Sequence, residues 1–240
     1  KRLWLSWDAT TQKGVDETLV NPRYAFRSTD NECEVIQACL MTVRHYKGKI
    51  KRVAGINTDF SYGRNGWEAF LAIMKKYDMG VDVVSDLWVK VGTTDLTSYV
   101  ATLQQAKPDL IFSSLLFADM PIFMRQAIAA GLAANTKFVF PAAGFQHVEL
   151  KKAFTPENMI LGHNTMYFEQ PGASPLLKEF VADYHKKYSS YPHFESDRAY
   201  FTMAAYRAAV EKALKASGKW PTVDQVSDAL RGIEVEPLGG

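Results

Sequence analysis

Residues 51–77 carry the pattern that most constrains the fold, a short apolar run followed by an amphipathic helical pattern. Residues 52–57 have the length and composition of a buried strand, and the segment 58–63 that follows contains Tyr62. Beyond it, apolar side chains recur at the i, i+3, i+4, i+7 spacing of one helical face, at Trp67, Phe70, Leu71 and Met74. A strand, a loop and an amphipathic helix in this order predict the first half of a βαβ unit. In open α/β sheets, such a loop lies where ligands bind.

The same alternation continues through the middle of the chain. Further strand-like runs at 81–87, 110–113 and 137–140 are separated by amphipathic helical patterns. The run 110–113 is almost continuously apolar, which is typical of strands that are buried on both faces of a parallel sheet. Residues 52–140 therefore predict an α/β fold with a Rossmann-like parallel sheet and helices on both faces.

The segments on either side of this sheet look like fragments of a second α/β layer. Two short strand-like runs and one helix precede it, and long helical patterns follow it at 175–188 and 196–216. We therefore assign residues 1–46 to part of a first lobe, 47–164 to a complete second lobe, and 165–240 to helices that return to the first lobe. The first lobe is expected to be partial, because the early strands of its sheet are not in the sequence.

The composition excludes several classes of function. Hydrophobic residues make up 47% and charged residues 22%, an ordinary globular balance. The net charge of +2 is too small to argue for nucleic acid or for an acidic membrane surface. No apolar stretch approaches the roughly 18 residues of a membrane span. We expect neither nucleic-acid binding nor membrane insertion.

The two cysteines, Cys33 and Cys39, fall in one predicted helix and on nearly opposite faces of it. They are not expected to form a disulfide with each other. The favoured interpretation is two buried thiols, with a metal or redox pair as the alternative.

The sequence contains no pattern typical of an active site. The five histidines do not show the H-E-x-x-H spacing of a metal site, and G-x-S-x-G is absent. The run 52–57 is followed by Asp-Phe-Ser-Tyr instead of the clustered glycines that bind a dinucleotide. We therefore expect no enzyme, and no bound cofactor or metal.

Several stretches match one family pattern in a consistent order. They are 25–28 (Ala-Phe-Arg-Ser), 52–54, 59–64 (Asp-Phe-Ser-Tyr-Gly-Arg), 92–95 (Gly-Thr-Thr-Asp), 108–111 (Pro-Asp-Leu-Ile), 123–127, 131–132 and 184–188. On these motifs the chain resembles the type I periplasmic solute-binding proteins over essentially its whole length, and most closely the leucine/isoleucine/valine-binding branch. Measured against that pattern, it looks truncated at both ends, without the beginning of the first lobe and a C-terminal segment.

This resemblance implies a function. Such proteins have two lobes that close on a hinge over a small-molecule ligand, and the closed form is received by the permease of an ABC transporter. The implied location is periplasmic or extracytoplasmic, with a signal peptide in the precursor. The alternative is a ligand-sensing receptor module of the same fold, a sensor of amides, urea or amino acids.

The resemblance also implies ligand-binding residues. Asp8, Ala9 and Thr10 match a segment whose hydroxyl and backbone hold the carboxylate and ammonium groups of an amino acid. Thr10 is the expected carboxylate donor, although it would equally cap the following turn. Tyr62 matches a tyrosine that closes over the ligand from the second lobe, with a plain loop aromatic as the alternative. Phe117 stands where the family often has tyrosine, and is expected to form an apolar wall or to pack in the core.

Position 142 departs from the family. The leucine-type proteins carry there a glutamate that accepts the ligand's ammonium group, and this chain has Ala142. An ammonium ion taken from water needs an anionic or well-oriented acceptor. Asp8 would supply that charge from the opposite lobe, or would cap a turn. Phe117, Phe145 and Trp7 beside Ala142 favour a more apolar ligand that bears a carboxylate. Two ligand classes therefore stay open, a branched-chain or hydrophobic amino acid and an aromatic carboxylate.

Overall fold

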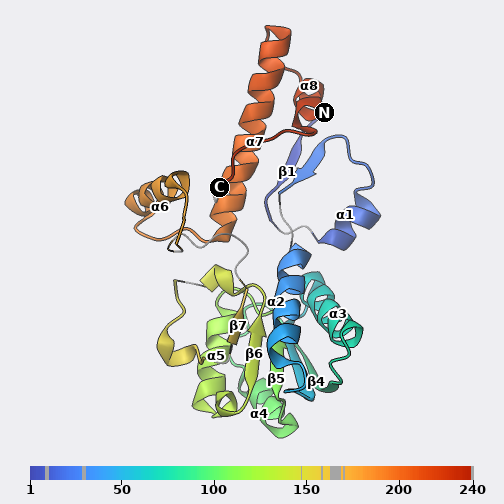
Figure 1. Ribbon diagram of the computed structural model, residues 1–240, viewed down its shortest axis with the longest axis vertical. Coiled ribbons are helices and arrows are strands. Elements are labelled where there is room, and N and C mark those ends of the chain that lie inside the picture. The colour runs from blue at the N-terminus through green and yellow to red at the C-terminus, as the bar shows by residue number, and fades with distance from the viewer. Residues whose placement is uncertain are drawn as a thin grey trace. The chain divides into compact units, whose positions relative to one another are not determined.

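The computed structural model describes residues 1–8, 11–28, 31–146, 148–157, 159–162, 169 and 171–238. The chain divides into two compact units (Figure 1). Unit 1 comprises Lys1–Asn31 and Thr165–Gly240, and unit 2 comprises Glu32–Asn164.

Unit 2 is built on a parallel sheet of five strands in the order β4-β3-β5-β6-β7. The strands are β3 (Arg52–Thr58), β4 (Asp82–Val89), β5 (Leu110–Ser113), β6 (Lys137–Phe140) and β7 (Met159–Leu161). The chain adds β4 on one side of β3 and then crosses to the other side to form β5. The predicted parallel α/β sheet is confirmed.

Helices cover both faces of this sheet (Figure 1). On one face lie α2 (Asn31–Tyr46) and α3 (Ser61–Lys76), and on the other lie α4 (Thr97–Ala106) and α5 (Asp119–Ala129). Short 3-10 turns follow α5 and β6 and precede β7, as η1 (Leu132–Ala134), η2 (Ala143–Gln146) and η3 (Lys152–Phe154).

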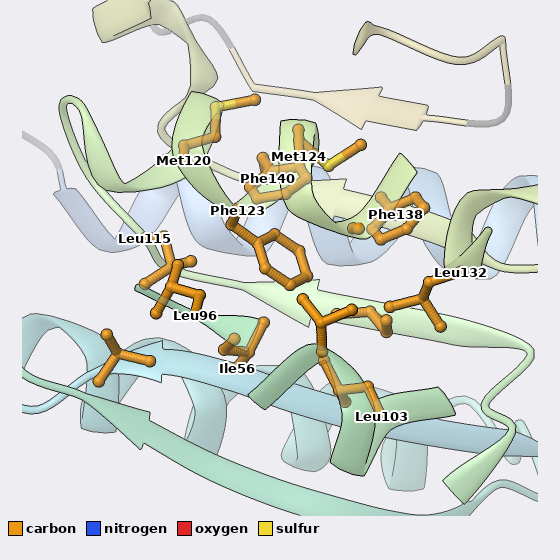
Figure 2. Packing of buried hydrophobic residues seen from close by; sticks show 14 of the residues in the cluster. Ile56, Leu96, Leu103, Leu115, Met120, Phe123, Met124, Leu132, Phe138 and Phe140 are labelled. Carbon is orange, nitrogen blue, oxygen red and sulfur yellow. The ribbon is translucent and has the colours of Figure 1, made fainter. Parts of the chain in front are cut away.

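The larger apolar core of unit 2 lies between the sheet and the α4 and α5 helices (Figure 2). Phe123 of α5 is at its centre, with its ring centroid 6.2 Å from that of Phe138 and 6.4 Å from that of Phe140. Ile56 of β3 faces this core, whereas Val53 faces the opposite one. Because successive side chains of a strand point to opposite faces, β3 contributes to both cores and is buried on both sides.

The second core lies under α2 and α3 and is rich in aromatic rings. The rings of Trp67 and Phe70 stack with their centroids 5.3 Å apart, and Phe70 lies 4.8 Å from Phe112 of β5. Val35 and Cys39 of α2 are buried in the same cluster. These rings are the apolar face that the spacing of residues 67–74 predicts.

The packing of α2 places the first boundary of unit 2 earlier than the sequence analysis does. Residues 32–46, which we had assigned to the first lobe, belong to unit 2, and the boundary lies between Asn31 and Glu32 instead of after residue 46. The physical reason is the burial of the α2 apolar face against the sheet that also packs α3.

Unit 1 has a smaller sheet, in which β1 (Trp4–Ser6) pairs in parallel with β2 (Ala25–Arg27). Its helices are α1 (Gln12–Thr18), α6 (Pro175–Tyr188), α7 (Phe194–Ser217) and α8 (Val223–Leu230). Leu5 and Phe26 pack with Ala209 of α7 and Val226 of α8. At the start of α1 the Thr11 hydroxyl accepts a hydrogen bond from the Gly14 N–H at 3.1 Å and caps the helix.

The thiols of α2 differ in burial. Cys39 is fully buried, but Cys33 is exposed, so the expectation of two buried thiols is wrong for Cys33. The side chain of Cys33 lies outside the stripe that packs on the sheet.

We expect thiol reagents to distinguish the two cysteines. Burial raises the pKa of Cys39 to about 12, so that its reactive thiolate is almost absent at pH 8. In native protein, a maleimide should label Cys33 and leave Cys39 unmodified until the chain is unfolded, as read by mass spectrometry. Cys33→Ser is the control and should abolish native-state labelling; fast labelling of Cys39 in that variant would contradict the burial.

Two glycines of α3 give a matched test of how tightly this helix packs. A Cβ at residue 63 would lie 2.1 Å from the Thr58 carbonyl oxygen, whereas a Cβ at residue 66 would meet only ordinary contacts, the nearest at 3.8 Å. Gly63→Ala should destabilise the protein by about 1–3 kcal/mol through overpacking. Gly66→Ala should be neutral or stabilising by up to about 1 kcal/mol, because alanine favours a helix interior. Urea unfolding measures both, and equal effects would contradict the close approach at Gly63.

Candidate functional site

The strand order of unit 2 singles out one place on the sheet. The chain adds β4 on one side of β3 and then adds β5 on the other side. The direction in which strands are added to the sheet therefore reverses at β3. In doubly wound sheets of this order, ligands bind outside the carboxyl ends of the strands at such a switch point. The carboxyl ends of β3 and β5 are therefore the first place to look for a site.

A buried hydrogen-bond network joins these two strand ends. The Asn57 Oδ1 atom accepts a hydrogen bond from the Ser114 N–H at 3.0 Å, and the Ser114 hydroxyl accepts one from the Thr58 N–H at 3.1 Å. All three residues are buried. The Asn57 Nδ2 group is buried without a hydrogen-bond partner among the described residues, so the network is not fully satisfied. Its two hydrogen bonds still hold Asn57, Thr58 and Ser114 together as a polar floor at the switch point.

Tyr62 lies in the first turn of α3, next to Gly63, which packs closely against Thr58 and Ser114. Tyr62 was predicted to lie in a loop, but β3 continues to Thr58 and α3 begins at Ser61. Its hydroxyl donates a hydrogen bond to the Glu34 Oε1 atom at 2.8 Å, and its ring stacks on that of Phe60 with centroids 6.2 Å apart. Tyr62 is thus held by a helix and by a hydrogen bond instead of by a flexible loop.

Glu34 reaches Tyr62 because α2 and α3 run side by side in the same direction. At their N-terminal ends, Glu34 meets Tyr62; at their C-terminal ends, the Lys47 Nζ atom donates to the Tyr77 carbonyl at 2.6 Å. Glu34 is only 5% exposed. Its position in the first turn of α2 suits a carboxylate, because the helix N-terminus carries partial positive charge.

Phe117 follows the carboxyl end of β5 and has an unusual backbone. Its φ angle is +50°, in the left-handed region that a bulky side chain rarely adopts, and its side chain is 51% exposed. Its ring lies 5.1 Å from the ring of Phe145, centroid to centroid. The strained backbone holds an aromatic ring outward at the sheet edge, so core packing does not describe this residue.

Ala142 follows β6 at the same edge, but it is only 3% exposed. Its methyl group is packed inside unit 2 and brings neither charge nor a hydrogen bond to the surface. Phe145, in the turn η2 that follows, contributes the partly exposed ring instead.

Asp8 belongs to unit 1, where it follows β1. It is partly buried, and its carbonyl oxygen accepts a hydrogen bond from the Ser6 hydroxyl at 2.7 Å. Ala9 and Thr10 lie outside the described residues. The candidate residues therefore fall into two groups, Tyr62, Phe117 and Ala142 on the carboxyl edge of the unit 2 sheet, and Asp8 in unit 1.

Glu34 and the network of Asn57 and Ser114 were not predicted from the sequence. Glu34 could have been noticed as an acidic residue one helical turn into a predicted helix, but its partner is 28 residues away along the chain. Ser114 could have been found by asking which polar residues follow each predicted strand.

Metal chemistry and membrane insertion find no support in the described part of the chain. Its histidines, cysteines and acidic residues do not gather into a group that could hold a metal ion. None of its helices combines the length and the apolar character needed to cross a lipid bilayer.

Comparison with known proteins identifies the family. The model of the periplasmic binding protein family matches residues 5–240. The chain belongs to this family. It has the α/β fold of the type I periplasmic binding proteins, with a five-stranded parallel sheet in unit 2 and a two-stranded one in the described part of unit 1. The family consists of solute-binding proteins and not of enzymes.

Individual relatives are distant. "Leu/Ile/Val-binding protein homolog 7" of Brucella abortus is 23% identical over 241 residues, which cover 95% of this chain and 56% of the relative. A leucine-, isoleucine-, valine-, threonine- and alanine-binding protein from Brucella ovis, solved in a closed conformation, is 22% identical with a TM-score of 0.73, over 98% of this chain and 58% of that one.

A solute-binding protein from Rhodopseudomonas palustris, in complex with 3,4-dihydroxybenzoic acid, is 21% identical with a TM-score of 0.71. The match covers 94% of this chain and 58% of that one. The chain thus spans a little over half the length of the relatives it matches.

The strain at Phe117 gives a prediction about stability. Phe117→Gly and Phe145→Ala each remove one ring of the same aromatic pair. Such a pair stabilises the folded protein by about 0.5–1.5 kcal/mol. Only the change at 117 also relieves a left-handed backbone, which costs a side-chain-bearing residue about 1–2 kcal/mol. In urea unfolding, Phe117→Gly should therefore be near neutral and Phe145→Ala destabilising. The reverse order would show that the backbone of Phe117 is not strained.

Proposed function

We propose that this chain is part of a solute-binding protein that captures a small organic ligand and delivers it to the permease of an ABC transporter. The observation that carries the proposal is the carboxyl edge of the unit 2 sheet. There the polar floor at the switch point is followed along the chain by Tyr62 after β3 and by Phe117 after β5. Ligand sites of this fold class lie at such an edge.

The proposed division of roles follows the two units. Asp8, Ala9 and Thr10 of unit 1 hold the carboxylate of the ligand and any cationic group beside it. Tyr62 and Phe117 of unit 2 close over its apolar part, with Phe145 supporting Phe117. Ala142 leaves that side without charge. The sequence predicts one lobe from residues 1–46 and 165–240 and a second lobe from residues 47–164. We propose these two lobes with one change, that helix α2 belongs to the second lobe instead of the first.

The proposed ligand is a branched-chain or hydrophobic amino acid, or an aromatic carboxylate. The first class has a precedent in the Brucella ovis protein, which binds leucine, isoleucine, valine, threonine and alanine. The second has one in the Rhodopseudomonas palustris protein with 3,4-dihydroxybenzoic acid. We further propose that the protein acts in the periplasm or an equivalent extracytoplasmic space, without cofactor.

A thermal-shift panel tests this proposal. The protein in its full natural length would be screened against leucine, valine, benzoate, 3,4-dihydroxybenzoate, acetamide and urea, because a ligand that binds only the native state raises the melting temperature. We expect a shift with an amino acid or an aromatic carboxylate. A shift confined to acetamide or urea, or none at all, would contradict the proposed ligand classes.

Variants then locate the site for the ligand that the panel identifies. Tyr62→Ala and Phe117→Ala should each weaken binding about 10-fold or more, which corresponds to about 1.4 kcal/mol. Tyr77→Ala is the matched control, because Tyr77 is a partly exposed tyrosine at the other end of α3. Isothermal titration calorimetry measures the three affinities, and equal losses at residues 62 and 77 would place the ligand elsewhere.

A further inference from the structure

Helix α2 exposes a second set of apolar side chains, which we call its outer face. Ile36, Leu40 and Met41 are each 40% exposed, and Cys33, one turn before Ile36, is exposed as well. Residues three and four apart along a helix are neighbours, so these four side chains form one continuous surface. Single exposed apolar residues are ordinary, whereas a contiguous group of them marks an interaction surface.

The packing of unit 2 does not use this outer face. The buried residues Val35, Ala38 and Cys39 occupy the opposite side of α2 and pack in the core with α3 and the sheet. A helix at the surface of an α/β unit needs only that one apolar stripe. The partner of the outer face therefore comes from outside the packing of unit 2.

The two ends of α2 carry opposite charges. Glu32 lies in its first turn, and Arg44 and His45 lie in its last. Arg44 is exposed and falls eleven residues after Cys33, which places both residues on the outer face, three helical turns apart. Arg44 forms no ion pair with the residues that the structure describes. A complementary partner therefore offers apolar groups between two charges, in the reverse order.

We propose that the outer face of α2 binds the same face of a second copy of this protein, with the two helices antiparallel about a twofold axis. Such an isologous contact uses one surface twice, so that each of its pairings occurs two times. In this arrangement Ile36 of one copy contacts Met41 of the other, and Cys33 lies opposite Arg44. Arg44 of each copy then approaches Glu32 of the other.

Charge selects the antiparallel orientation. A parallel pair would bury the same apolar groups, but it would set Arg44 beside Arg44 and Glu32 beside Glu32, and like charges opposite each other are unfavourable. Antiparallel helices also bring the positive end of one dipole to the negative end of the other. A standard interface has about 20–30 residues a side, and one helix face offers fewer. The dimer is therefore expected to be weak and to form at high protein concentration.

Sedimentation velocity over a concentration series tests the contact in the full-length protein. Wild type should change from monomer to dimer as the concentration rises. Leu40→Asp should raise the dimer Kd about 10-fold or more, because it places a charge in the apolar contact. Leu214→Asp is the matched control, since Leu214 is a leucine of α7 with 38% exposure, close to the 40% of Leu40. It should leave the Kd unchanged.

A disulfide tests the orientation. In Arg44→Cys, Cys33 of one copy faces the new thiol of the other, and mild oxidation should give a covalent dimer in non-reducing electrophoresis. Within one helix these two positions are about 16 Å apart. A disulfide needs Cα atoms within roughly 7 Å, so the bond cannot form inside one chain. Wild type and the double variant Cys33→Ser/Arg44→Cys should give no covalent dimer.

Four outcomes would overturn the proposal. The first is a wild type that stays monomeric over the whole concentration series, which needs no variant. The second is a disulfide between two Cys33 residues in oxidised wild type, identified by mass spectrometry, because it requires parallel helices. The third is an Arg44→Cys variant that gives no covalent dimer. The last is an equal loss of affinity in Leu40→Asp and Leu214→Asp. In all four cases the proposed solute-binding function stands, because the ligand panel tests it separately.

Discussion

The rest of unit 2 depends on the burial of β3 and β5 between two layers of helices. Side chains of both strands alternate between the core under α4 and α5 and the aromatic core under α2 and α3. A strand that is buried on both faces must satisfy its backbone within the sheet, and parallel neighbours on both sides of β3 do so. The buried polar network of Asn57, Thr58 and Ser114 lies at the carboxyl ends of these two strands.

The carboxyl edge combines rigidity with local strain. The hydrogen bonds of Asn57 and Ser114 leave the floor little freedom, and the close approach of Gly63 to Thr58 brings the start of α3 onto it. Phe117 departs from ordinary backbone geometry at the same edge. Strained residues persist only where the surrounding structure over-determines them, and they cluster at binding sites. The edge therefore combines a fixed backbone with an outward aromatic ring, which supports the ligand site that we propose there.

Much of this architecture was predictable, and the errors have identifiable causes. The βα alternation and the core face of α3 follow from periodicity, which depends on nearest neighbours along the chain. Tyr62 was placed in a loop because the apolar pattern of α3 becomes visible only at Trp67, one turn after the helix begins. The start of unit 2 was set too late because a helix pattern does not say which sheet it packs on. Cys33 was expected to be buried because residue type alone was used for its environment.

The sequence by itself determined the fold class and the absence of a carboxylate at residue 142. It also determined that Tyr62, Phe117 and Ala142 each follow the carboxyl end of a strand. These depend on local pattern and residue identity. Only the tertiary structure decided that Glu34 meets Tyr62. That contact joins two helices whose relative position is set by the packing of both on one sheet. No local pattern encodes it, because the two residues belong to separate helices and only the shared core brings them together.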